Sequence, residues 1–85
     1  MEQKIEKVTE LMARVIKLNE KAKEHFFRFE FGGNTKRVNF DKWDKSFNII
    51  YSHYSYLDKP ELSVSLEDIE KLITAEEEAQ KEIEQ

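Results

Sequence analysis

Residues 27–33 read Phe27-Arg28-Phe29-Glu30-Phe31-Gly32-Gly33, and this segment decides the fold. Aromatic side chains alternate with charged ones along it, which is the period-two pattern of a strand with one buried face. The two glycines that follow tolerate positive φ and therefore suit a tight hairpin connection. We expect a strand whose three phenylalanines point into the core, followed by a turn.

Two more strand patterns follow the hairpin. Residues 37–41 place Val38 and Phe40 on the inner side of a returning strand. Residues 42–45 interrupt the alternation and are expected to form a turn around a tryptophan. Residues 47–57 are again β-prone, with Phe47 and Ile49 expected to face inward. Together these segments predict a three-stranded antiparallel meander with one face in the core.

Helical patterns flank the meander on both sides. The apolar positions of the first segment follow the spacing of one helix face, and four further apolar residues widen that face. The residues of the face are Ile5, Val8, Met12 and Val15, and those that widen it are Leu11, Ile16, Leu18 and Ala22. Asn19 continues the spacing, either at the polar edge of the core-facing stripe or as a coiled-coil residue that sets register. Ser65 precedes Glu67 and Asp68 as an expected cap of the last helix.

The chain of 85 residues has no proline-rich or glycine-rich linker, so we expect one domain over residues 1–85. The order of elements predicts an α+β fold with two layers. In this fold the helices at the N- and C-terminal ends pack on the same face of the sheet. We write the order as α-β-β-β-α.

The composition argues against several classes of protein. The absence of cysteine excludes disulfides and thiolate metal sites, and the two histidines leave little for catalysis. No metal-binding or phosphate-binding motif is present, so we expect a non-enzymatic protein without metal or cofactor. The apolar runs are too short for a membrane span, and the charged start is unlike a signal peptide. The expected location is the cytoplasm.

The outer face of the predicted sheet is the first candidate site. It combines cationic, aliphatic and aromatic side chains, a composition typical of protein interfaces. The residues are Arg28, Arg37, Ile50, Tyr54 and Tyr56. Two alternatives remain open. The face is an ordinary solvated surface with cross-strand ion pairs, or it stacks single-stranded nucleic acid, which Glu30 and Asp41 would oppose.

The acidic C-terminal segment is the second candidate site. The net charge of the whole chain is −4, but residues 67–85 alone carry eight acidic side chains against two lysines. Glu76, Glu77 and Glu78 occupy a full helical turn. They form either a solvated helix end or an acidic surface that mimics DNA and inhibits a DNA-binding host protein.

The pattern of residues 27–33, Trp43 and the acidic last helix resembles small proteins of Gram-positive bacteriophages and prophages that have no assigned activity. The resemblance spans most of residues 5–75, although this chain lacks a glycine before Trp43. It implies an accessory role in the host cell, with a host or phage protein as partner.

Self-association is a further expectation. The apolar residues of the first helix exceed what one small sheet covers, which predicts a homodimer. The candidate contacts are Leu11, Leu18 and the outer patch of Ile50, Tyr54 and Tyr56.

Overall fold

The computed structural model describes residues 2–84, with the side chains of all of these except Pro60, Ile83 and Glu84. The first and last residues of the expected domain therefore lie outside the described residues. The elements are α1 (Glu2–Lys21), β1 (His25–Gly32), β2 (Arg37–Asp44), β3 (Ile49–Tyr56), the short 3-10 helix η1 (Pro60–Leu62) and α2 (Leu66–Glu84). This order confirms the predicted α+β fold.

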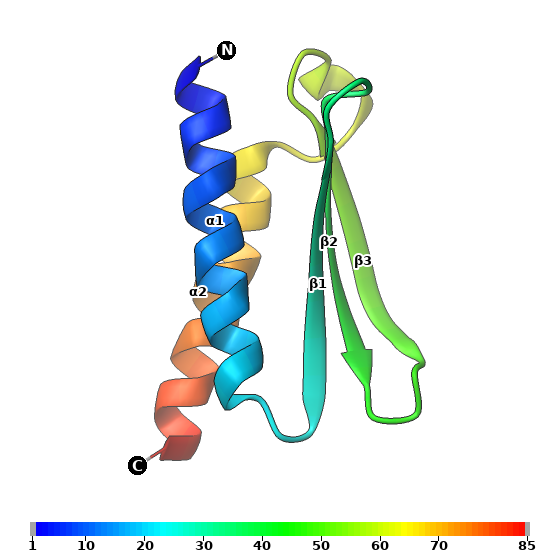
Figure 1. Cartoon of the computed structure of the whole chain (residues 1–85). Coiled ribbons are helices and arrows are strands. Elements are labelled where there is room, and N and C mark those ends of the chain that lie inside the picture. The colour runs from blue at the N-terminus through cyan, green and yellow to red at the C-terminus, as the bar shows by residue number, and fades with distance from the viewer. Residues whose placement is uncertain (1, 85) are drawn as a thin grey trace.

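The three strands form one antiparallel sheet in the order β1-β2-β3, with both helices on one face (Figure 1). The two helices run parallel to each other, because an odd number of antiparallel strands, three, lies between them in the chain. The alternation of residues 27–31 is retained: Phe29 lies opposite Phe40, and Phe31 lies opposite Val38. Cross-strand partners share a face of the sheet, so these four side chains lie on the helix side.

The core lies between the sheet and the helix pair. Its buried hydrophobic residues are Val8, Leu11, Val15, Leu18, Phe27, Val38, Phe40, Leu57, Ile69 and Ile73. Phe27 and Phe40 stack with ring centroids 6.0 Å apart. Phe29 and Phe31 are half-buried against the same cluster. Full burial of an aromatic or branched side chain contributes on the order of 2 kcal/mol, so this cluster is the main source of stability.

The buried face of α1 differs from the expected one. Leu11 and Leu18 lie at its centre and are fully buried, whereas Ile5 and Met12 are exposed. The prediction that Leu11 and Leu18 contact a second copy is therefore wrong. Residues 8, 11, 15 and 18 have the same 3-4-3 spacing as the expected set, so the contact face is rotated toward the two leucines without a change of period.

Asn19 has a role that neither expectation described. Its side-chain amide donates to the carbonyl of Phe27 at 2.8 Å, and its oxygen accepts from the Phe27 N–H at 2.7 Å. The Asn19 side chain therefore makes the two hydrogen bonds that a residue of a neighbouring strand would make to the edge of β1 facing away from β2.

Both turns of the sheet depart from the prediction. In the first turn the positive φ of 54° belongs to Lys36, and neither glycine has positive φ. Residues 42–44 continue β2, and the second turn begins after Asp44. Asp44 accepts hydrogen bonds from the N–H groups of Ser46 and Asn48, both at 2.9 Å. This carboxylate stabilises the turn that the alternation did not locate.

The inward placement of Phe47 and Ile49 is wrong. Phe47 lies in the second turn with a φ of 64°, and 74% of it is exposed. β3 begins at Ile49, and Ile50 is an extra residue in a β-bulge opposite Lys42 and Trp43. A bulge changes the phase of alternation, which is why both isoleucines are exposed.

The predicted cap of the last helix is confirmed. The Ser65 hydroxyl accepts from the Asp68 N–H at 3.1 Å, and the Asp68 carboxylate accepts from the Ser65 N–H at 3.2 Å. These bonds lower the pKa of Asp68, because they favour the ionised form. α2 continues beyond Ile73 as far as Glu84.

Candidate protein-interaction surface

The outer face of the sheet is not covered by either helix (Figure 1). Its centre is a polar cluster around Asp41, which is 1% exposed although it points away from the core. Arg28 approaches the Asp41 carboxylate from β1 at 2.8 Å, and the Ser52 hydroxyl donates to it from β3 at 2.5 Å. Arg28 also pairs with Glu30 at 3.2 Å. One of the expected cross-strand ion pairs, Arg28 with Asp41, is therefore present, and Asp41 joins all three strands.

An aromatic cluster lies at the end of this face beside the second turn. Phe26 stacks on Trp43 with centroids 5.8 Å apart, and the Phe47 ring meets Phe26 edge-on at 5.5 Å. The Arg28 guanidinium lies 5.5 Å from the centroid of the Trp43 ring. The indole N–H of Trp43 is buried without a hydrogen-bond partner among residues 2–84. We call Phe26, Trp43 and Phe47 the aromatic cluster.

The aromatic cluster was not predicted, because the second strand was expected to end before Trp43. The signal was present in the pattern of residues 37–43. If the alternation of that strand is continued through residue 43, Trp43 falls on the outer side with Arg37 and Asp41. The same alternation places Phe26 outward, in phase with Arg28.

The other end of the face holds three of the predicted residues. Arg37 lies over the ring of Tyr54 at 5.7 Å, and the rings of Tyr54 and Tyr56 meet edge-on at 5.7 Å. Tyr54 is exposed, whereas Tyr56 is half-buried. The structure therefore brings Arg37, Tyr54 and Tyr56 together. Ile50 lies separately at the start of β3, closer in sequence and register to Trp43.

The acidic residues of α2 are used largely within the protein. Glu76 pairs with Lys42 at 3.0 Å and accepts from the Tyr51 hydroxyl at 2.8 Å. Burial, reinforced by Glu76, raises the pKa of Tyr51. Glu77 pairs with Arg14 at 2.6 Å. Of the three glutamates, Glu76 and Glu77 are half-buried and Glu78 is exposed.

Arg14 links the two helices through a second carboxylate. It donates to Glu70 at 3.0 Å and to Glu77, and its hydrogen bonds to Glu77 raise the pKa of the guanidinium. Opposing effects act on Glu70. Burial raises the pKa of Glu70, but bonds from Lys7 and Arg14 outweigh it and leave the pKa lowered. These pairs favour the charged form of the Glu70 carboxylate.

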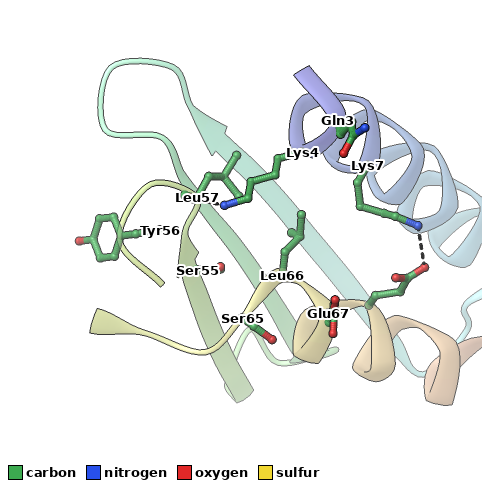
Figure 2. Close-up of a pocket in the computed structure, with 10 residues that line it drawn as sticks. Gln3, Lys4, Lys7, Ser55, Tyr56, Leu57, Ser65, Leu66 and Glu67 are labelled. Carbon is green, nitrogen blue, oxygen red and sulfur yellow. Dashed lines mark hydrogen bonds and ion pairs between the residues drawn. The ribbon is translucent and has the colours of Figure 1, made fainter. Parts of the chain in front are cut away.

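A pocket of ≈ 370 Å³ opens between the start of α1, the end of β3 and the start of α2 (Figure 2). Its walls include Leu57 and Leu66, and two lysines reach into it. Lys4 donates to the Leu57 carbonyl at 2.6 Å, and Lys7 pairs with Glu70 at 3.2 Å. The ammonium groups of both lysines therefore have partners within the protein and are not free to bind a ligand.

Within residues 2–84, no group of three or more histidine, aspartate or glutamate side chains is arranged to hold a metal ion. In the described part, neither helix has the length and apolar character needed to cross a membrane.

Comparisons of the chain with protein-family models, with curated proteins and with solved structures found no match. The resemblance to phage proteins therefore stays a prediction. The function proposed below rests on the residues of the outer face of the sheet.

Proposed function

We propose that this protein is a non-catalytic interaction domain that binds another protein through the outer face of its sheet. The supporting observation is the concentration of exposed apolar side chains there. Phe47, Ile49, Ile50 and Tyr54 belong to this face or its border and are all at least 45% exposed. Clustered apolar and aromatic side chains with an arginine beside them are typical of the energetic centre of an interface.

The charge pattern favours a protein partner over nucleic acid. Arg28 is committed to Asp41 and Glu30, so its charge is largely balanced within the sheet. Glu30 is exposed beside it and would repel phosphates. Arg37 is the remaining cation on the face, which is too little positive charge for a strand of phosphates.

The acidic helix is less suited to DNA mimicry than the outer face is to protein binding. Glu76 and Glu77 would have to give up Lys42 and Arg14 to meet a basic partner. The resemblance to phage proteins supports an accessory role in the cytoplasm of a host cell, with a host or phage protein as the partner.

The test compares two single substitutions of exposed apolar residues. Phe47→Ser changes the outer face, and Ile16→Ser is a matched control on α1, where Ile16 is also exposed. Each variant is immobilised, and proteins captured from the host lysate are quantified against the unchanged chain. We expect a specific partner to be lost with Phe47→Ser and retained with Ile16→Ser. Equal capture by both variants would contradict the outer face as the binding surface.

A titration with labelled single-stranded oligonucleotides at low and moderate salt provides the second arm. We expect no saturable binding. Saturable binding that weakens as salt rises would replace the protein-binding proposal with the nucleic-acid alternative.

A further inference from the structure

The two edges of the sheet are treated differently by the rest of the chain. At the edge formed by β1, the N–H and C=O groups of Phe27 point away from β2 and both bond to Asn19. We call this the covered edge. Among the described residues, no side chain bonds in this way to the middle of the edge formed by β3, and we call it the open edge.

Only the last residue of the open edge is capped. The Tyr56 N–H donates to the Ser63 hydroxyl at 2.9 Å, and the Tyr56 carbonyl accepts from the Lys59 N–H at 3.3 Å. Both groups therefore point away from β2. Because this direction alternates along a strand, the N–H and C=O groups of Ser52 and Tyr54 point the same way.

Those four backbone groups have no hydrogen bond among residues 2–84. The bulge at Ile50 and the cap on Tyr56 limit the free segment on its two sides. β3 also contains no charged residue and no proline, the features by which proteins usually prevent edge strands from pairing.

The flank of α2 above the open edge is apolar in its middle, between Asp68 and Glu82. Ile69 and Ile73 of α2 point into the core, and Glu70 and Glu77 turn toward α1. The opposite flank of a helix is offset by three residues, so its middle carries Leu72, Ala75 and Ala79. Both helices lie on one face of the sheet (Figure 1), with α1 packed on β1 and α2 on β3, so this flank lies on the side of the open edge. A second helix can approach such a flank closely.

We propose that a second copy of this chain pairs with the open edge, strand β3 against strand β3, antiparallel and centred on His53. In this register Ser52 of each copy lies opposite Tyr54 of the other. Each such pair exchanges two backbone hydrogen bonds, so all the free groups of both copies are satisfied. The two sheets become one continuous sheet, and the α2 helices meet above the junction through Leu72, Ala75 and Ala79.

A second copy fits this edge for two reasons. The free segment has the same length in both copies. A two-fold axis through His53 therefore places Ser52 of each copy opposite Tyr54 of the other. Along the strand junction the pairing also brings no like charges together, since β3 is uncharged. The inference concerns the edge of the sheet and is separate from the proposed binding of another protein on its outer face.

Two single-cysteine variants test the register, and the native chain has no cysteine to interfere. Residues opposite each other in a non-hydrogen-bonded pair have Cα atoms about 4.5 Å apart, within disulfide reach. Under mild oxidation His53→Cys is therefore expected to form a covalent dimer. Ser52→Cys is the exposed control, because in this register the two positions lie on the order of 8 Å apart. Cross-linking of Ser52→Cys but not His53→Cys would overturn the proposed register.

Sedimentation velocity over a range of concentrations tests the association itself. We expect a reversible dimer for the unchanged chain and for Tyr54→Ala, which retains the backbone N–H. Tyr54→Pro removes that N–H, which has no partner inside one copy, and should give a folded monomer. A strict monomer at high concentration for the unchanged chain overturns the proposal, as does an equal dimer in Tyr54→Pro. A strict monomer of the unchanged chain that still captures its partner in a Phe47-dependent manner would overturn this inference alone.

Discussion

The two edge strands of this small sheet offer a direct comparison. β1 carries charged residues within its length and is bonded by Asn19, whereas β3 is uncharged and exposes the backbone groups of Ser52 and Tyr54. Both strands have eight residues and pair with the same central strand. The difference therefore lies in side chains outside the ladder, which decide whether an edge is closed to other strands.

Asp41 is the residue that couples the two edges, and its removal should have the largest effect. Asp41→Ala leaves Arg28 and Ser52 without their shared acceptor in a buried position. We expect a loss of about 2 kcal/mol in the free energy of unfolding, limited because Arg28 can turn to solvent. Urea denaturation measures it. Ser52→Ala is the control and should cost less than half as much; an equal cost would show that the Arg28 pair contributes nothing.

Asn19→Ala should convert the covered edge into a second open one. The substitution removes two hydrogen bonds to the backbone of Phe27, for an expected loss of about 1 kcal/mol. The amide of Phe27 should also exchange its hydrogen faster, because it becomes accessible to water. Hydrogen exchange followed by NMR measures both effects. Unchanged protection of the Phe27 amide would contradict the assignment of Asn19 as the cover.

Ser63→Ala should lengthen the open edge by one residue. The hydroxyl of Ser63 is the acceptor for the Tyr56 N–H, and its loss should cost about 0.5–1 kcal/mol in the free energy of unfolding. The freed N–H should strengthen association of two copies. Thermal denaturation and sedimentation at matched concentrations measure the two changes, and weaker association would count against pairing through β3.

The turn before β3 should respond to acid. Hydrogen bonds from the backbone of Asn48, and then from its side chain and Ser46, lower the pKa of Asp44 below its usual 3.8. A lowered pKa stabilises the fold above the unfolded value, and this stabilisation is lost as the pH falls below it. We expect the melting temperature of the unchanged chain to fall more steeply than that of Asp44→Asn between about pH 5 and pH 2. Parallel curves would show that Asp44 does not fix the turn.

The order of elements was accessible from the sequence because it depends on local periodicity. Phe27, Phe29 and Phe31 alternate strictly with charged residues. Ser65 precedes a helix whose Asp68 can bond back to the Ser65 N–H. Phe47 could not be placed by the same argument, because the bulge at Ile50 changes the phase of β3. Nothing in the local sequence of residues 47–57 marks that extra residue.

The candidate surface was only partly predictable for a different reason. Arg37, Tyr54 and Tyr56 meet as expected, since their positions follow from the register of neighbouring strands. The commitment of Glu76 to Lys42 and of Asn19 to Phe27 depends on how the helices lie over the sheet. Such contacts between elements are set by packing of the whole core, and no pattern within either helix reveals them.

The parallel arrangement of the two helices has a consequence for synthesis of the chain. Lys7 and Glu70 lie 63 positions apart, as do Arg14 and Glu77, so neither ion pair can form before α2 has been synthesised. During translation α1 can meet β1, but its flank facing α2 stays in water until α2 has emerged from the ribosome. Closure of such long loops is slow compared with helix formation. A stalled or shortened product would therefore leave the side of α1 that faces α2 exposed to solvent. Chaperones and proteases would recognise such a form.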